Sequence, residues 1–389
     1  FATGALSVPN LFCAPAKSIQ VSAGDFPREN TLVSFPVSSD EPMLLMDRDH
    51  NSIPVQQDGH GYGWFILPKL EKGRTALLSI SRGASPKSDG VQIGRNGTKY
   101  EFRAGNHALM EYQAEPGALP REDIKSLFVR GGYLHPIRTL AGKSVTDDFP
   151  PNHIHHHGVW WAWTKTEFEG RHPDFWNMGD GKGKVEFEAV DKTFSGPVFA
   201  RFQARHRFVD MTAEQPKTAL KESWDVRAFA PSPKSTFWLF DFQSSQTCAT
   251  ASPLKLPEYR YGGLGFRGNW AWNGKDKTDF LTSEGERDRE KGQGTRARWC
   301  DISGLVDGQR VGIAILCHPS NFRAPQPMRL HPTEPFFNFA PQEAGDMAIE
   351  PGQPYLARYR FVVHDGPPDK DLIERLWNDY AHPPAVEAE

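Results

Sequence analysis

The stretch VFARFQARHRFVD, residues 198–210, decides the fold class, because apolar and polar side chains nearly alternate along it. Alternation with a period of two is typical of a strand with one buried face. Similar stretches follow at 220–229 and 235–248, so we expect a large antiparallel sheet with one solvated face. The apolar positions in the first stretch, interleaved with Arg and Gln in an imperfect register, are Phe199, Phe202, Ala204 and Phe208.

The predicted domain organisation follows from where such strands are interrupted. Short β-type runs and turns fill residues 18–84, which we expect to form a small β-sandwich. The polar segment ASPKSDG, residues 84–90, is the expected linker. Residues 91–385 are then expected to form a large β-supersandwich, and residues 1–17 an N-terminal arm. The predicted fold class is therefore all-β, closed by one C-terminal helix.

Composition excludes several classes of protein. The 389 residues carry a net charge of −3, with acidic and basic residues interspersed. This gives neither the basic footprint of a nucleic-acid-binding protein nor a polybasic membrane patch. No run of about 18 apolar residues is present, so no membrane-spanning helix is expected. The first residues lack a signal peptide's charged start and apolar core, and we expect a mature periplasmic or secreted chain. No pattern predicts the oligomeric state.

Two segments near the C-terminal end have distinct predictions. The charged stretch 273–296 is expected to be an exposed loop. The only convincing helix follows Asp369, a residue suited to the N-cap, and ends before Pro383. One face of this helix carries Leu372, Ile373, Leu376, Trp377 and Tyr380.

The four cysteines do not have metal-site spacing. None of them is paired as Cys-x-x-Cys, so a zinc knuckle is not expected. Their disulfide pairing stays open, because four cysteines allow three connectivities. The residues are Cys13, Cys248, Cys300 and Cys317.

Histidines and tryptophans gather in residues 132–176 more densely than anywhere else in the chain. His can donate, accept, titrate near neutral pH and bind metals. Trp suits stacking on a sugar ring or covering a pocket. The residues of this stretch that we expect to line a site are His135, His153, His155, His156, Trp160 and Trp176.

The cluster H-I-H-H-H, residues 153–157, leaves three alternatives open. In a strand, His153, His155 and His157 would share one face. Alternate imidazoles can bind a metal ion, for which His153, His155 and His156 are the candidates. They can equally transfer protons and bind hydroxyls. In the third alternative, the segment is a polar loop with a single functional His.

Several segments together resemble one bacterial family. They are GYLHPIRTLAGKSVTDDFPPNHIHHHGVWWAW at 132–163, DFW at 174–176, YRYGGLGFRG at 259–268, RWCDISG at 298–304, CHPSNFRAPQP at 317–327, FFNFAP at 336–341 and YRFVVHDG at 359–366. The chain resembles, from about Val21 to Gly366, a family of unknown function often labelled PmoA-like, after a methane oxygenase subunit. Many of its members have Pro and Arg where this chain has Ile154 and His157.

A second resemblance is architectural. A strand-rich chain bearing His and Trp is similar to the galactose-mutarotase-like supersandwich proteins. That resemblance implies a carbohydrate substrate, because the fold serves sugar epimerases, polysaccharide lyases and some glycoside hydrolases. Fold alone does not fix an activity.

Other polar residues are candidates for substrate binding. Tyr261 and Arg267 flank glycines that permit close approach of a ligand, and Arg267 can bind a carboxylate through two hydrogen bonds. His318 and Asn321 follow an apolar strand, where polar groups often line a pocket. Lys143, in a turn, is expected to reach the histidines. Each has a plain alternative as a turn or surface residue.

Three carboxylates are candidates for catalysis. Glu343 follows FFNFAPQ and is the preferred one, and Glu222 and Asp241, both on predicted strands, are the alternatives. Each can equally be a solvated acidic residue. His135 can act in catalysis or be a satisfied core histidine.

From these patterns and the resemblance, we expect a carbohydrate-active enzyme that cleaves glycosidic bonds in a poly- or oligosaccharide. Hydrolysis by two carboxyl groups is slightly favoured over β-elimination by a His or Tyr beside a uronate. The alternatives are a non-catalytic glycan-binding protein and a metal-dependent enzyme that uses the His cluster. We expect no obligatory cofactor, no nucleic acid partner and no membrane association.

Overall fold

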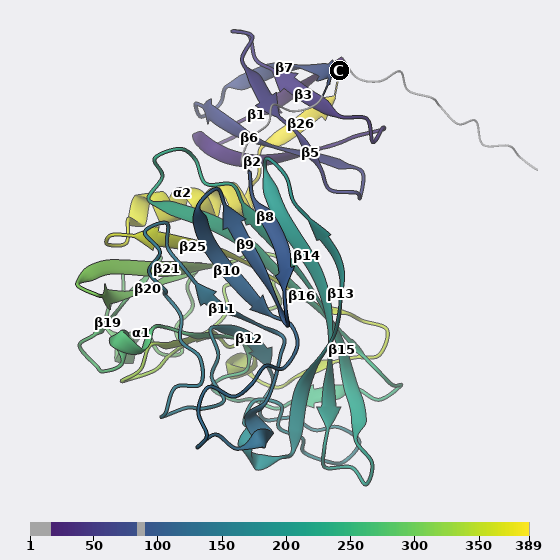
Figure 1. Cartoon of the computed structure of the whole chain (residues 1–389), viewed down its shortest axis with the longest axis vertical. Coiled ribbons are helices and arrows are strands. Elements are labelled where there is room, and N and C mark those ends of the chain that lie inside the picture. Colours follow the sequence, from purple (N-terminus) through teal and green to yellow (C-terminus); the bar gives the residue numbers. More distant parts are fainter. Residues whose placement is uncertain (1–16, 84–89, 389) are drawn as a thin grey trace, which may run out of the picture. The chain divides into compact units, whose positions relative to one another are not determined.

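The computed structural model describes residues 17–83 and 90–388, which form two compact units built mostly of strands (Figure 1). One unit contains described residues 17–83 together with 383–388, and the other contains residues 90–382. The predicted arm and most of the predicted linker lie outside the described residues. In the described part of the chain, no helix has the length and apolar character that crossing a membrane requires.

The small unit has a five-stranded sheet, β26-β1-β7-β3-β4, and a three-stranded sheet, β2-β6-β5. Their buried side chains, among them Val21, Phe35 and Phe65, form a core of their own. Alternation in the sequence therefore produced the expected β-sandwich faces. The strands are β1 (Ser18–Ser22), β2 (Arg28–Pro36), β3 (Met43–Met46), β4 (Ser52–Pro54), β5 (Gln56–Gln57), β6 (Tyr62–Leu70), β7 (Thr75–Arg82) and β26 (Ala385–Ala388).

The last strand differs from the predicted boundary at residue 385. Strand β26 pairs antiparallel with β1, with Val386 opposite Val21. Val386 packs against the core of the small unit. The chain therefore returns to its first unit after the helix, because β1 offers an unpaired edge that an apolar strand can cover.

The large unit contains two eight-stranded antiparallel sheets, as the all-β prediction requires (Figure 1). Sheet one has the order β22-β23-β18-β12-β11-β10-β9-β8. Its strands are β8 (Gln92–Asn96), β9 (Lys99–Ala104), β10 (His107–Gln113), β11 (Tyr133–Ile137), β12 (Val159–Ala162), β18 (Gly263–Arg267), β22 (Met328–Leu330) and β23 (Phe336–Phe339).

Sheet two has the order β13-β14-β15-β16-β25-β21-β20-β19 and contains the longest strands. Its strands are β13 (Gly183–Phe194), β14 (Phe199–Asp210), β15 (Lys217–Phe229), β16 (Phe237–Cys248), β19 (Thr278–Thr282), β20 (Trp299–Val306), β21 (Gln309–Cys317) and β25 (Tyr355–Asp365). A two-stranded sheet joins β17 (Leu254–Leu256) to β24 (Met347–Ile349).

Strand β14 shows how the sequence pattern becomes packing. From Phe202 onward, Ala204, His206 and Phe208 are buried, whereas Arg205 and Arg207 between them are exposed. The Phe202 ring lies 4.3 Å, centroid to centroid, from that of Tyr112 on β10, across the two sheets. The two large sheets therefore share one hydrophobic core.

The C-terminal helix is confirmed and one loop prediction is wrong. Helix α2 (Lys370–Ala381) begins at Asp369, whose side chain accepts a hydrogen bond from the Leu372 amide at 3.0 Å. The stretch 273–296, expected to be an exposed loop, contains β19 and the short helix α1 (Arg289–Gly292). Its many charges hid the alternation of buried Thr278, Phe280 and Thr282.

Short 3-10 turns join these strands, and the described cysteines are free. The turns are η1 (Ser126–Phe128), η2 (Met178–Asp180), η3 (Trp270–Trp272) and η4 (Pro341–Ala344). Cys248, Cys300 and Cys317 form no disulfide, and Cys13 lies outside the described residues.

Candidate functional site

A cavity of about 130 Å³ opens where four segments of the large unit meet. It is smaller than the roughly 300–1,000 Å³ typical of pockets that enclose a drug-sized molecule, so it fits one small group or one end of a ligand. Its lining is unusually rich in imidazoles and cations. The lining residues are His153, His155, His156, Trp176, Asn177, Arg260, Tyr261, Arg329, His331 and Phe336.

The His cluster forms turns, not the strand in which alternate histidines share a face. The His153 amide donates to the Pro150 carbonyl at 3.0 Å, and the His156 amide donates to the His153 carbonyl at 2.8 Å. These turns bring His153, His155 and His156 to the cavity together. His157 instead points into the protein, where its ring stacks on Tyr133.

Aromatic rings form the floor beneath these histidines. The His156 ring stacks on Phe336 at 4.8 Å and lies 5.1 Å from Trp160. Trp160 is completely buried and packs 4.9 Å from Trp176. The predicted stacking walls therefore differ: Trp176 lines the cavity, whereas Trp160 supports it from below. Trp160 lies on the face of β12 opposite to that of Trp161, which packs against Phe242 of the second sheet. It is buried under the cavity residues, and Gly265 of β18 makes room for its ring.

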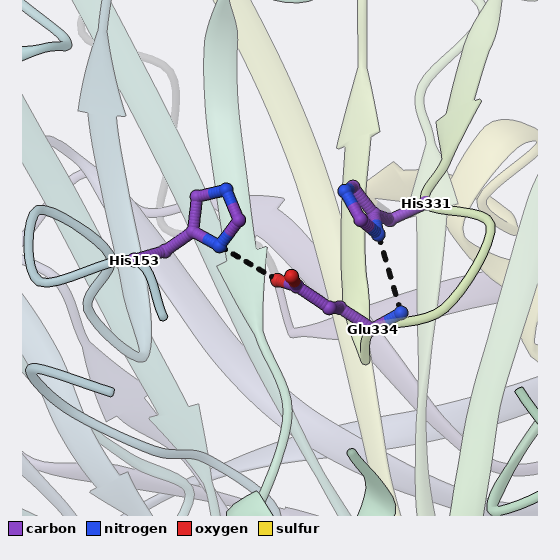
Figure 2. Close-up of side chains that lie close together, drawn as sticks. All are labelled: His153, His331 and Glu334. Atoms are coloured by element: carbon purple, nitrogen blue, oxygen red, sulfur yellow. Dashed lines mark hydrogen bonds and ion pairs between the residues drawn. The ribbon is translucent and has the colours of Figure 1, made fainter. Parts of the chain in front are cut away.

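Glu334 is the carboxylate at the centre of the site. Its Oε2 accepts a hydrogen bond from Arg267 Nη1 at 2.6 Å and lies 2.9 Å from His153 Nδ1. Figure 2 shows the His153 and Glu334 side chains pointing toward each other from separate loops. Burial alone would raise the pKa of Glu334, but His153 and Arg267 lower it to about 2. Glu334 is therefore a carboxylate at neutral pH. Its position 2.9 Å from Nδ1 favours the tautomer of a neutral His153 ring that has its proton on Nδ1 and a lone pair on Nε2.

His331 has the opposite arrangement of protons. Its Nδ1 faces the backbone N–H group of Glu334 at 3.2 Å (Figure 2). The backbone N–H group of Thr333 lies 3.4 Å from the same atom. An N–H can only donate, so Nδ1 accepts and the neutral ring carries its proton on Nε2. Burial lowers the pKa of His331 to about 4, so the ring is neutral near pH 7. His153 and His331, with ring centroids 5.8 Å apart, thus present a base and a proton donor.

The other two histidines of the cavity are held neutral by their surroundings. Burial, reinforced by His153 and His157, lowers the pKa of His155 to about 3. Burial also places the pKa of His156 well below its ordinary value. Both rings therefore serve near pH 7 as neutral hydrogen-bonding groups.

Three residues have the spacing of a cation site. Donor atoms of His153, His331 and Glu334 lie within 4.8 Å of one another, and two imidazoles with a carboxylate suit Zn²⁺. This set differs from the predicted His153, His155 and His156. A metal-bound imidazole donates through its other nitrogen, whereas His331 accepts there, and Arg267 already occupies Glu334. These hydrogen bonds favour proton transfer over metal binding.

Two arginines add positive charge to the cavity lining. Arg260 is exposed, and Arg329, half-buried, donates to Gln293 Oε1 at 2.9 Å. Within the described residues, neither guanidinium forms an ion pair. Both are consequently available to bind an anionic group of a ligand.

Several sequence candidates lie close to the cavity without lining it. Arg267 is completely buried and binds Glu334, so it holds a catalytic candidate in place instead of contacting substrate. Glu343 accepts a hydrogen bond from Gln293 at 3.0 Å, and burial raises its pKa. His135 lies behind the turn, with Nδ1 3.0 Å from Thr146 Oγ1. Of the predicted binding residues outside 132–176, Tyr261 lines the cavity.

The two alternative carboxylates are not brought to this cavity. Glu222 is buried on β15 and accepts hydrogen bonds from Ser244 at 2.5 Å and Gln246 at 2.8 Å. Asp241 on β16 binds Arg360 of β25 at 2.7 Å. Each carboxylate accepts hydrogen bonds from polar side chains of the large sheet, which explains its presence on a strand.

Three further predicted binding residues also lie elsewhere. His318 packs against Tyr380 of α2, with ring centroids 4.8 Å apart. Asn321 is buried and donates to the Arg358 carbonyl at 2.8 Å. Lys143 forms an ion pair with Asp307 at 2.9 Å and does not reach the histidines. Local turn and strand pairing accounts for all three.

Sequence reasoning missed five residues of the site. Two of them are direct sequence neighbours of predicted site residues, which could have indicated them. Arg260 precedes Tyr261 in the quoted motif, and Asn177 follows Trp176. Arg329 and His331 are two apart, which in β22 and the residue after it directs both to one face. The missed residues are Asn177, Arg260, Arg329, His331 and Glu334.

Comparison with protein families matches residues 99–378, well over half of the chain, to DUF6807, described as a family of unknown function. The match contains every residue of the cavity. The search of curated proteins gave no match.

Proposed function

The chain belongs to the DUF6807 family, and we propose that it is a carbohydrate-active enzyme that cleaves an acidic saccharide by β-elimination. The substrate would be a uronate-containing oligo- or polysaccharide whose end enters the cavity. The resemblance to mutarotase-like proteins supports the substrate class, and the charges around the cavity support the reaction. A periplasmic or extracellular location, where such polymers occur, is part of the proposal.

The observation that carries the proposal is the complementary protonation of His153 and His331. Glu334 keeps the proton of His153 on Nδ1, so Nε2 can accept a proton from the carbon beside the uronate carboxylate. The electron pair of that C–H bond forms the C=C bond, and the adjacent C–O bond to the leaving sugar breaks. His331 Nε2–H donates a hydrogen bond to the departing oxygen, and the proton that His153 has accepted then passes to that oxygen, which returns both imidazoles to their starting state.

Elimination also needs neutralisation of the substrate carboxylate. The proton beside a carboxylate becomes acidic only when the negative charge that develops on its oxygens is stabilised. Arg260 and Arg329 supply positive charge in the cavity lining and have no ion-pair partner among the described residues. A uronate carboxylate between them would turn the adjacent C–H bond toward His153.

The arrangement favours elimination over the hydrolysis that sequence reasoning slightly preferred. Canonical hydrolysis uses two carboxyl groups that flank the bond, about 5–10 Å apart. Glu222 and Asp241 are engaged elsewhere in the large sheet, and Glu343 accepts a hydrogen bond from Gln293 and does not line the cavity. Glu334, the carboxylate that reaches the site, is held by Arg267 with a pKa of about 2, too low for a general acid.

The test is a screen of acidic and neutral glycans with two readouts, ultraviolet absorbance of unsaturated uronates and release of reducing ends. We expect both signals with a uronate-containing glycan and neither with neutral glycans. His153→Ala should lower kcat by about 10²-fold or more. The matched control is His107→Ala, because His107 is an exposed histidine of β10 outside the cavity.

Three outcomes would count against the proposal. Reducing ends without ultraviolet absorbance would mean hydrolysis. Saturable glycan binding without turnover would favour the non-catalytic glycan-binding alternative. Equal turnover in His153→Ala and His107→Ala would place the chemistry outside this cavity.

A further inference from the structure

A second cavity, of about 560 Å³, lies beside the segment that follows Trp176. Trp176 and Asn177 line the His-rich cavity, whereas Met178 and Gly181 of the same segment line the second one. Turn η2 (Met178–Asp180) follows the lining residues of the smaller cavity in the sequence and forms part of the wall of the larger cavity. The two cavities are neighbours along one stretch of backbone, so one extended ligand can be considered for both.

Arg130 gives the second cavity its chemistry. This arginine is 4% exposed, and its donated hydrogen bonds go to its own neighbours, the carbonyls of Gly131 at 3.2 Å and Gly132 at 3.5 Å. In the described part of the chain, no carboxylate forms an ion pair with it. Burial lowers its pKa to about 10, so the guanidinium remains charged at neutral pH. Glu222 and Asp148 offset part of the cost of burying this charge, and an anionic ligand in direct contact would offset more of it.

The remaining charges of this cavity do not balance Arg130. Lys184 on β13 and Arg207 on β14 both form ion pairs with Glu186. One carboxylate therefore faces three cations among the charged lining residues. The excess positive charge attracts an anion to the position nearest Arg130.

The rest of the lining is apolar and partly exposed. Leu127 is 50% exposed and Val129 37% exposed, and Phe187 and Met178 complete this side. A fitting ligand therefore has an acidic group for Arg130 and a C–H face for these side chains. A uronate ring has both features, whereas an inorganic anion has only the first.

We propose that the cavity at Arg130 is a second subsite that binds another acidic residue of the same saccharide. This inference rests on the proposed function for the identity of the chain that spans both cavities. The first subsite would hold the residue that loses its proton, beside Arg260 and Arg329. The Arg130 subsite would hold a neighbouring uronate through its carboxylate and increase affinity for oligosaccharides over single sugars.

The binding test uses isothermal titration of D-glucuronate and D-galacturonate, with inorganic sulfate at constant ionic strength as the comparison. We expect Arg130→Gln to weaken uronate binding at one site by about tenfold or more, because a charge-assisted contact is lost. Arg205→Gln is the matched control, since Arg205 lies on β14, is exposed and pairs with Asp191 outside the cavity. Equal affinity and stoichiometry in the two variants would overturn the subsite. Sulfate binding that depends on Arg130 without uronate binding would overturn its saccharide assignment.

A stability measurement separates a ligand-binding arginine from a structural one. Without ligand, Arg130→Met should unfold at a higher temperature than the unsubstituted chain, because it removes a buried charge whose desolvation exceeds its attraction to Glu222 and Asp148. A lower unfolding temperature would mean that Arg130 stabilises the fold and would contradict the inference. Binding at Arg130 is measured without turnover, so it can succeed when the elimination reaction fails. Conversely, turnover with no effect of Arg130→Gln on the KM for oligosaccharides would overturn the subsite alone.

Discussion

Five histidines lie between residues 135 and 157. The residues that contact each imidazole determine which of them can act as a base. His135 contacts Thr146, and His157 contacts Asp148 inside the protein. His153 alone of the five faces both the cavity and a carboxylate, Glu334. A histidine-rich motif therefore contains one oriented base, and its orienting residue comes from a distant loop.

Glu334 is predicted to act through His153. Glu334→Gln removes the negative charge that holds the proton on His153 Nδ1, so kcat should fall by about 10²-fold or more while KM changes little. The control is Glu343→Gln, because Glu343 does not line the cavity and hydrogen-bonds Gln293. Steady-state kinetics of both variants check this, and a Glu334→Gln enzyme as active as Glu343→Gln would contradict the assignment.

Activity is predicted to survive removal of metal ions. The Nδ1 atom of His331 accepts backbone hydrogen bonds, and Arg267 engages Oε2 of Glu334, so a cation would have to compete with these protein partners. Dialysis against a chelator followed by elemental analysis and assay tests this point. Retention of turnover in metal-free protein is expected. Loss of turnover that stoichiometric zinc restores would instead support the metal-dependent alternative.

The neutral histidines of the cavity are predicted to make stability depend on acid. The pKa of His155 is about 3 in the folded chain, below the value of about 6.5 for an unfolded histidine. The unfolded chain therefore binds more protons, and stability is lost as pH falls from about 6.5 toward 3. Between pH 7 and 5, His155→Gln should lose roughly 1 to 2 kcal/mol less stability than the unsubstituted chain, measured by urea unfolding. An equal loss would mean that His155 is protonated in the folded state.

At the scale of elements, the site depends on strand β18 as much as on the His turn. Gly265 of β18 lies opposite Trp160 of β12. A Cβ atom at Gly265 would lie 2.7 Å from the Trp160 ring, which is too close. The glycine thus allows Trp160 to lie flat under His156 and Trp176.

Gly265→Ala is predicted to destabilise the large unit by about 1–3 kcal/mol, through overpacking against a fully buried ring. The matched control is Gly94→Ala in β8, where an added Cβ meets no atom within 4 Å. That substitution should change stability by less than about 1 kcal/mol. Chemical unfolding measures the free energy of unfolding of both variants. Equal effects would show that the packing around Trp160 rearranges at little cost to stability.

Elements were predictable from sequence where the pattern was local. Alternation identified the β14 strand, and an N-cap with a helical apolar face identified α2. The strand β19 was missed because surrounding charges outnumbered its short alternation. The His turn at 150–158 was left open between strand and loop, although two prolines and an Asn precede it. Glu334 and His331 could not be assigned, since only the tertiary fold brings their loop to the His turn.

At the scale of the whole molecule, the chain builds two cores and closes the first with its last strand. Val386 of β26 packs on the small core and pairs with Val21 of β1. The family match, residues 99–378, lies within the large unit, which contains the proposed site. The division separates the unit that contains the proposed site from a smaller unit that has its own core.

Val386→Asp is predicted to unfold the small unit at lower temperature while the large unit keeps its own transition. A charge at this position would be partly buried beside apolar side chains without a partner. Glu387→Ala, at the exposed neighbouring position, is the control. Scanning calorimetry should show the lower transition shift for Val386→Asp alone, with turnover unchanged below that temperature. A shift of every transition together would contradict independent cores.

The most direct measurement is a crystal structure of His153→Ala soaked with a uronate oligosaccharide. Removal of the proposed base should trap the substrate without reaction. The account predicts a carboxylate between Arg260 and Arg329, with the adjacent C–H bond directed at the space left by the imidazole. A saccharide bound elsewhere on the large unit, with this cavity empty, would contradict it.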